Sequence, residues 1–359
     1  DFETPAHVQD AARAALGKGS SHYTAVAGIP ALRQAIVDDS KKRRGGQAHE
    51  LDEVIVSVGA KHSLFNLALA LLNPEDEVII PAPYWVSYPE QVRLAGATPV
   101  IVSTSSKDRF RMSPLQLEAA VSEKTKALVL CTPSNPTGAA YTEAELRGLA
   151  EVIRKHNFWV IVDEIYAQLV YGGFQQKSLL EIAPDLRDRL LIVDGVSKTF
   201  AMTGWRIGWL LGPKEVVKAC DKIQGQATTN PTAIAQHATI AALTGTQEPV
   251  EAMRRAFERR RTLLVEGLGK LPGFECAMPE GAFYAFPRID ALLGKKAGDR
   301  VLEDDVTFAT WLLEEARCAV VPGTAFGAPG HLRISYATSE EQLEEGLRRM
   351  GQALAKLSD

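Results

Sequence analysis

The stretch Leu190-Leu191-Ile192-Val193-Asp194-Gly195-Val196-Ser197-Lys198-Thr199 decides how the chain is interpreted. It opens with a near-continuous apolar run that ends on a carboxylate, which is typical of a strand covered on both faces of a sheet. Lys198 follows in a loop of small and polar residues, where its amine could reach a ligand bound beyond the carboxyl end of that strand. For Lys198 taken alone, a solvated loop lysine is the alternative interpretation.

Similar apolar runs recur between segments with helical patterns. This alternation predicts βαβ units and an α/β fold, in which a large domain has a mostly parallel seven-stranded sheet. The further runs lie at 54–58, 77–80, 98–102, 126–131, 159–163 and 206–211.

The texture of the sequence changes from about Pro249 onward. Helical patterns at 251–268, 305–316 and 340–357 accompany a strand-like run at 331–336, which predicts a smaller α+β domain. We therefore expect a large domain over residues 12–265, and a small domain made of residues 1–11 and 266–359.

Composition excludes several functional classes. The chain has 359 residues, a formal net charge of −4 and 46% hydrophobic residues, which is ordinary for a globular protein of two domains. The densest basic run, Lys41-Lys42-Arg43-Arg44, is short and precedes two glycines, so we interpret it as the solvated end of a helix. Neither nucleic acid nor a membrane is expected as a partner.

Cysteine and histidine usage favours a reduced compartment and a site without metal. The four cysteines are far apart and form no C-x-x-C pair, which indicates a cytoplasmic protein. The seven histidines show no metal-ligand spacing.

Arg206 lies in Gly204-Trp205-Arg206-Ile207-Gly208, at the start of a predicted buried strand. A guanidinium in that position needs an anion, and a phosphate accepts its bidentate fork. The sequence therefore predicts an anion site eight residues beyond Lys198.

Two further polar residues follow predicted strands. Asp163 closes the run at 159–163, where a carboxylate is costly unless it caps the next segment or pairs with a cation such as a protonated pyridine nitrogen. Tyr166 could then donate a hydrogen bond to the phenolic oxygen of such a ring. Asn135, in the stiff turn Thr132-Pro133-Ser134-Asn135-Pro136-Thr137-Gly138, is either simple loop chemistry or a second donor to that oxygen.

Taken together, these segments resemble the class I/II aminotransferases of the fold-type I pyridoxal-phosphate (PLP) enzymes, over essentially the whole chain. The motifs that carry the resemblance occur in the family's order and spacing. They are Asn-Pro-x-Gly at 135–138, Asp-Glu-x-Tyr at 163–166, Ser-Lys at 197–198, Gly-Trp-Arg-x-Gly at 204–208, Pro-Glu-Gly-Ala-Phe-Tyr at 279–284 and Val-Pro-Gly-Thr-Ala-Phe-Gly at 321–327.

The resemblance implies a role for each matching residue. Lys198 would hold PLP as an internal imine and act as general acid and base, while Asp163 would pair with the pyridinium and Asn135 and Tyr166 would contact the ring hydroxyl. Arg206 would bind the phosphate. The remaining implied cofactor contacts are Gly59, Ala60 and Lys61 at a helix N-terminus, Trp85 stacked on the ring, and Ser197.

The resemblance also implies the substrate contacts and the assembly. Arg333 would clamp the substrate α-carboxylate, although a surface charge on a strand is the alternative. Tyr23 would reach the phosphate of a neighbouring subunit, which implies a homodimer with shared sites. A Gly-containing segment upstream of Asp1 would touch the substrate carboxylate. The family's alpha branch has a phosphate-binding serine at the position of Gly195, so Ser197 is the candidate substitute.

Substrate choice depends on Lys61. The alpha branch takes the distal carboxylate of aspartate with an arginine in the region of residues 227–237, where this chain has none. The gamma branch uses a lysine at the position of Lys61, which implies ping-pong transfer from L-aspartate to 2-oxoglutarate. The alternatives are a Lys61 that points to solvent, an aromatic or prephenate-type aminotransferase of the same fold, and a non-catalytic regulator that retains the fold.

Overall fold

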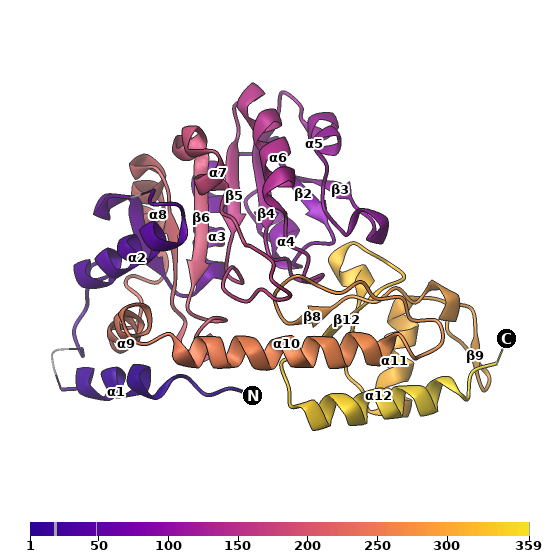
Figure 1. Ribbon diagram of the computed structural model, residues 1–359. Coiled ribbons are helices and arrows are strands. Elements are labelled where there is room, and N and C mark those ends of the chain that lie inside the picture. The colour runs from indigo at the N-terminus through magenta and orange to yellow at the C-terminus, as the bar shows by residue number, and fades with distance from the viewer. Residues whose placement is uncertain (18–19, 48, 359) are drawn as a thin grey trace.

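A seven-stranded sheet organises the larger part of the molecule in the computed structural model, which describes residues 1–17, 20–47 and 49–358 (Figure 1). The strand order is β1-β7-β6-β5-β4-β2-β3. All pairs are parallel except those that β7 makes with β1 and β6. The strands are β1 (Val54–Ser57), β2 (Glu77–Ala82), β3 (Thr98–Ser103), β4 (Thr125–Cys131), β5 (Trp159–Asp163), β6 (Leu190–Gly195) and β7 (Gly208–Leu211). The predicted α/β fold with a mostly parallel seven-stranded sheet is confirmed.

The apolar runs became strands because both faces of the sheet are buried. Within β4, Leu128 and Leu130 pack into one hydrophobic cluster, whereas Ala127 and Val129 pack into another on the opposite face. A strand buried on both sides needs apolar residues at every position, which is the pattern that the sequence shows.

Helices supply the two covering layers. Those whose residues join the first cluster are α1 (Ala6–Ala15), α2 (Pro30–Arg43), α5 (Pro114–Ala120), α6 (Glu143–Lys155), α7 (Leu179–Ile182) and α9 (Ala233–Thr244). Those on the opposite face are α3 (Ala60–Leu71), α4 (Ser87–Leu94) and α8 (Lys214–Ala227).

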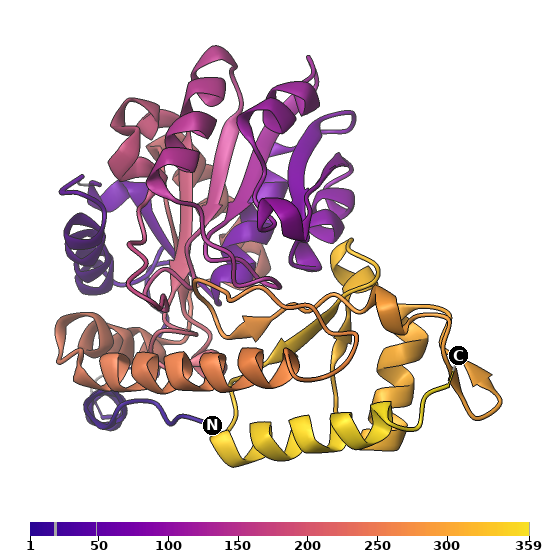
Figure 2. The same ribbon diagram turned by 45° about the vertical axis from the view of Figure 1, so that its right-hand side comes forward.

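The long helix α10 (Glu248–Leu268) runs below the carboxyl ends of the parallel strands and leads into the C-terminal part of the chain (Figures 1 and 2). There the antiparallel sheet β11-β12-β8 packs with α10 and two further helices around a third hydrophobic cluster. The elements of this part are β8 (Tyr284–Ala285), β9 (Lys296–Ala297), β10 (Arg300–Val301), α11 (Asp305–Ala316), β11 (Val321–Pro322), β12 (Leu332–Ser335) and α12 (Glu340–Leu354). The division into a large domain of residues 12–265 and a small domain of residues 1–11 and 266–359 stays a prediction.

The N-terminal segment touches both parts of the molecule. Helix α1 lies against α9, whereas Phe2 packs edge-on against Phe257 of α10 at 5.2 Å between ring centres. Thr4 donates a hydrogen bond to the carbonyl of Ala201, three residues beyond Lys198. The segment therefore lies close to the loop that carries Lys198.

One expectation about the surface is wrong. Lys41 and Lys42 are exposed at the end of α2, as expected for a solvated helix end, but Arg44 is only 1% exposed. Its guanidinium is buried because it pairs with two carboxylates at the ends of β5 and β6. Those partners are more than a hundred residues away in sequence, so the local pattern gave no sign of them.

Within the described ranges, no helix is both long and apolar enough to cross a membrane. The four cysteines are all free thiols.

Candidate active site

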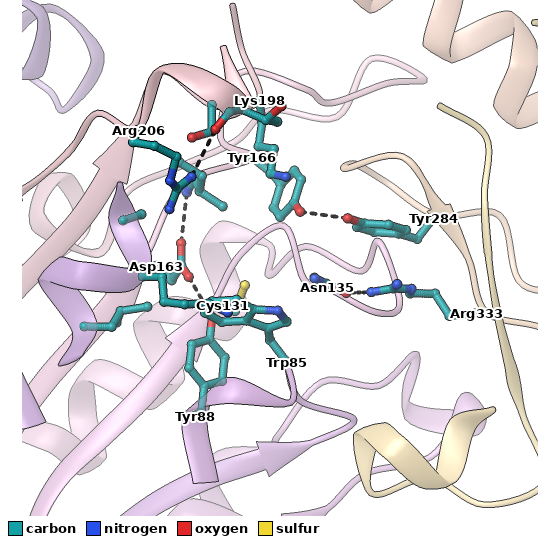
Figure 3. A pocket seen from close by; sticks show the side chains of 16 residues that line it. Trp85, Tyr88, Cys131, Asn135, Asp163, Tyr166, Lys198, Arg206, Tyr284 and Arg333 are labelled. Carbon is teal, nitrogen blue, oxygen red and sulfur yellow. Dashed lines mark hydrogen bonds between the residues drawn. The ribbon is translucent and has the colours of Figure 1, made fainter. Parts of the chain in front are cut away.

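A cavity of about 260 Å³ lies at the carboxyl ends of β4 and β5, between the large sheet and β12 (Figure 3). Most of the predicted site residues line it, although they come from segments spread over the whole sequence. They are Ala60, Lys61, Trp85, Asn135, Asp163, Tyr166, Ser197, Lys198, Arg206 and Arg333. Two predicted residues do not line it: Gly59, which directly precedes Ala60, and Tyr23, which is 89% exposed.

Asp163 provides a buried carboxylate at one end of the cavity. It is the last residue of β5, and its Oδ2 accepts a hydrogen bond of 2.7 Å from the hydroxyl of Tyr88 while Oδ1 accepts one of 3.1 Å from the backbone N–H of Ile165. Burial raises the pKa of Asp163 to about 6, against the lowering effect of the Tyr88 hydrogen bond. A cationic ring nitrogen at this end would supply the missing counter-charge and lower that pKa.

Lys198 lies in the loop after β6 with its amine directed into the cavity (Figure 3). Its Nζ is 5.6 Å from the ring centre of Phe283 and 6.0 Å from that of Tyr166. Burial lowers the pKa of Lys198, and the positive charge of Arg206 lowers it further, whereas Asp163 opposes both effects. A lower pKa raises the share of neutral amine, which is the form that attacks an aldehyde and accepts a proton.

Arg206 faces the N-terminus of α3 from a tight turn. We expected it at the start of a strand, but it follows the 3₁₀ turn Thr203–Trp205 with φ +57°, and β7 begins only at Gly208. The turn lets the guanidinium leave the sheet, where it donates to the carbonyls of Thr203 and Val58 at 3.1 and 3.3 Å. In the described part of the chain it pairs with no carboxylate, so its charge is available to an anion.

Gly59 makes this approach possible. It has φ +84°, and a Cβ at this position would lie 2.5 Å from Nη2 of Arg206. The first backbone N–H groups of α3, from Ala60 and Lys61 onward, therefore lie beside a guanidinium. Helix N-terminal amides and an arginine together suit a phosphate.

Gly195 explains the departure from the alpha-branch pattern. It pairs with Gly208 across β6 and β7, and a Cβ at Gly195 would lie 2.9 Å from the carbonyl oxygen of Ile207. A serine cannot fit there without moving the backbone. Ser197, which lines the cavity and is 8% exposed, keeps its place as the candidate hydroxyl.

Arg333 enters the cavity from β12 on the opposite side. Its Nη1 donates a hydrogen bond of 2.9 Å to Oδ1 of Asn135, and its guanidinium carbon lies 4.7 and 4.8 Å from the ring centres of Tyr284 and Phe326. Figure 3 shows Arg333 and Tyr284 facing Asn135 and Tyr166. Arg333 therefore points into the site and is not a surface charge.

Tyr166 and Lys61 are the remaining predicted residues with side-chain contacts at the cavity. The hydroxyls of Tyr166 and Tyr284 are 3.0 Å apart, so Tyr166 has a hydroxyl partner within the protein. On the other side of the cavity, Nζ of the exposed Lys61 lies 4.8 Å from the ring centre of Trp85.

Sequence reasoning missed six residues of the cavity: Leu64, Tyr88, Cys131, Ile165, Thr203 and Tyr284. Tyr284 lay inside a recognised motif and Tyr88 three residues after Trp85, but neither spacing indicates a contact. The hydrogen bond from Tyr88 to Asp163 spans 75 residues and becomes visible only in three dimensions.

The residues present fit pyridoxal phosphate. A buried carboxylate suits the ring nitrogen, an amine suits the aldehyde, and an arginine beside helix N-terminal amides suits the phosphate dianion. Fold and site together define a PLP-dependent enzyme of fold type I.

Comparison with known proteins gives the family. The model of the family "Aminotransferase class I and II" matches residues 1–350, so the chain belongs to that family and is a PLP-dependent transferase. An aspartate aminotransferase of Geobacillus stearothermophilus is 47% identical over 98% of this chain and 88% of its own length. An aspartate/prephenate aminotransferase of Cereibacter sphaeroides is 48% identical over 100% of this chain and 90% of its own length.

Solved structures agree with this assignment. The crystal structure of the aspartate aminotransferase from Rhizobium meliloti superimposes with a TM-score of 0.97 at 45% identity, over 100% of this chain and 90% of that one. The predicted fold and the predicted enzyme class are both confirmed.

Proposed function

We propose that the protein transfers the amino group of L-aspartate to 2-oxoglutarate by a ping-pong mechanism. Besides Lys198 and Arg206, the cavity has two further basic side chains, Arg333 from β12 and Lys61 from α3, and this observation carries the choice of substrate. A dicarboxylic amino acid presents two anions. The names of the relatives from Geobacillus stearothermophilus and Rhizobium meliloti support the same substrate.

When bound, PLP withdraws electrons from the bond between the substrate Cα and its hydrogen. Asp163 supports this chemistry because its carboxylate favours the protonated ring nitrogen. Asn135 and Tyr166 would hold the phenolic oxygen of the ring and Trp85 would stack on the ring face, which their position on the cavity supports.

The phosphate would lie between Arg206, the amides of Ala60 and Lys61, and the hydroxyl of Ser197, while Gly59 leaves room for the guanidinium. An arginine at this end serves a second purpose, since its charge helps to lower the pKa of Lys198. The Nζ of Lys198 would then accept the proton that leaves the substrate Cα and later give it back.

Arg333 would bind the α-carboxylate of the substrate through its paired N–H groups, which match a carboxylate. Lys61, beside Trp85, would bind the distal carboxylate. Because aspartate and 2-oxoglutarate both carry two carboxylates, they can occupy the same positions beside Arg333 and Lys61 in the two half-reactions.

We further propose that the enzyme acts as a homodimer in the cytoplasm. Tyr23 is 89% exposed and lies outside the cavity of its own subunit, which suits a side chain that reaches the phosphate of a neighbour. Four free thiols suit a reducing compartment.

Prephenate is a second candidate substrate, because the relative from Cereibacter sphaeroides carries that name. Prephenate also has two carboxylates, so the pairing of Arg333 and Lys61 serves either molecule. Comparing kcat/KM for aspartate, prephenate and phenylalanine separates these substrates.

Absorption spectroscopy and peptide mapping test the proposal. The holoenzyme should show a cofactor band near the visible edge that bleaches when aspartate is added. Borohydride reduction before digestion should leave a pyridoxyl group on the peptide that contains Lys198, and a holoenzyme without that adduct contradicts the assignment.

A further inference from the structure

The buried cation Arg44 lies behind the carboxyl ends of β5 and β6, which lead to Asp163 and Lys198. Arg44 follows α2 and is 1% exposed, yet it does not reach the cavity. Its Nε donates to Oε2 of Glu164 at 2.7 Å, and its Nη2 donates to Oδ2 of Asp194 at 2.9 Å. One guanidinium thus joins two strands that are neighbours in the sheet.

Both carboxylates belong to the segments that carry the chemistry. Glu164 directly follows Asp163 at the end of β5, and Asp194 precedes Lys198 by four residues at the end of β6. Their second oxygens are also bound: Ser178 donates to Oε1 of Glu164 at 2.6 Å, and the N–H of Gly195 donates to Oδ1 of Asp194 at 2.7 Å. The orientation of each strand end is therefore fixed from behind.

Two guanidiniums pair with three carboxylates at this position. Glu164 and Asp194 are 2% and 3% exposed, and both raise the pKa of Asp163, although less than burial does. Arg43 contributes a second cation, since its Nη2 bonds Asp194 at 2.7 Å while the same guanidinium also pairs with Asp39. Without Arg44, the buried carboxylates of Glu164 and Asp194 would keep only Arg43 as a cation, and both lie close to the carboxylate of Asp163.

We propose that Arg44 is a positioning residue, which acts through Glu164 and Asp194 to place Asp163 and Lys198 and to balance the charge behind the cofactor. The inference rests on the proposed PLP chemistry. It concerns a residue outside the cavity, and its effect reaches the cofactor through the backbone and through the electrostatic potential.

The pH at which the cofactor absorption band is half titrated (its midpoint) measures the electrostatic potential at the cofactor in the holoenzyme. The band reports protonation of the nitrogen that joins Lys198 to the cofactor. The other titratable or charged groups around it are Lys61, Tyr88, Cys131, Asp163, Tyr166, Arg206, Tyr284 and Arg333, all of which stay unchanged in the variants.

Four variants test the proposal without substrate. Arg44→Met adds one net negative charge and should raise the midpoint by about one pH unit, because a more negative site favours the protonated nitrogen. Glu164→Gln should lower it, and the double variant R44M/E164Q should return it to the wild-type value. Arg44→Lys keeps the charge and should leave the midpoint within a few tenths of a unit.

Turnover gives an independent measurement. In Arg44→Met, kcat should fall about tenfold with KM for aspartate changed less than about threefold, because displaced catalytic groups slow the chemistry more than they weaken binding.

Arg187→Met is the matched control. Arg187 pairs with Glu53 at 2.6 Å near the opposite end of β6, and it lies outside the cavity. Its loss should lower the melting temperature but leave the midpoint and kcat unchanged. Equal midpoints in wild type, Arg44→Met and Glu164→Gln, or an equal shift in Arg187→Met, would overturn the proposal. If Arg44→Met does not fold, Glu164→Gln alone decides. A wild-type protein without any cofactor band would instead refute the proposed function.

Discussion

The two sides of the cavity differ in how far they are exposed to solvent. Asp163, Tyr88 and Tyr166 form a floor and are each 3–4% exposed, whereas Lys61 and Arg206 form a rim and are exposed. On the floor, burial moves pKa values, as it does for Asp163. On the rim, the guanidinium and the ammonium are basic groups that can bind anions. The floor therefore sets the reactivity of the site, and the rim sets what binds.

Removal of the Lys198 amine should have the largest effect, because it takes away the group between floor and rim that both holds the cofactor and moves the proton. In Lys198→Ala, kcat should fall by about 10⁴-fold or more. Single-turnover absorbance with aspartate measures this loss. Lys218→Ala, on the exposed face of α8, is the control and should retain wild-type turnover. Activity within about tenfold of wild type in Lys198→Ala would contradict the assignment.

Arg333→Lys keeps the charge that faces the floor but loses the bidentate fork. We expect kcat/KM to fall by about 10²-fold for every amino acid, because the α-carboxylate is common to all of them. Steady-state kinetics with aspartate and phenylalanine check this. A loss confined to aspartate would mean that Arg333 reads the side chain instead.

Asp163, on the floor of the cavity, should make the stability of the apoenzyme depend on pH. Its pKa of about 6 lies above the value of about 3.9 in an unfolded chain, so its contribution to stability is complete below pH 4 and is lost as the pH rises through 6. Asp163→Asn cannot lose a proton, so the apoenzyme of the variant should gain a few degrees in melting temperature relative to wild type between pH 4 and 7.

Calorimetry of the two apoenzymes across this pH range measures the difference. Pyridoxal phosphate should reverse the order at pH 7, because its ring nitrogen pairs with the wild-type carboxylate. A difference that does not change with pH would show that Asp163 keeps an ordinary pKa.

Lys61→Ala should have the smallest effect, since an exposed cation is screened by water. We expect kcat/KM to fall by about tenfold for aspartate and to stay unchanged for phenylalanine. Lys61→Arg should keep most of the aspartate activity. An equal loss for both substrates would remove the distal-carboxylate role.

Most of the fold could be read from the sequence because the sheet is covered on both faces. Runs such as Leu190–Val193 are apolar at every position, and that signal is local. The motif residues Asp163, Asn135 and Lys198 could be assigned to one site for a related reason, since the carboxyl ends of parallel strands meet at one edge.

The sequence-based predictions failed where a residue's position depends on contacts with distant segments. Arg206 begins a strand-like sequence pattern, yet it adopts a left-handed backbone conformation and its guanidinium approaches Gly59. Arg44 looked solvated because its partners Glu164 and Asp194 are 120 and 150 residues away. Tyr88 was missed for the same reason. Polar contacts between distant segments leave no periodicity in a single sequence.

The hydrogen bond between Arg333 and Asn135 joins residues that are 198 positions apart, and the cavity draws on segments from Ala60 to Arg333. Such non-local pairing forms late in folding, after the cost of closing long loops has been met. A nascent chain therefore cannot capture the cofactor until nearly all of it has left the ribosome. Appearance of the bound-cofactor band during refolding would then time the last step of assembly, and ligand added beforehand should pull the equilibrium toward the native state without speeding the earlier steps.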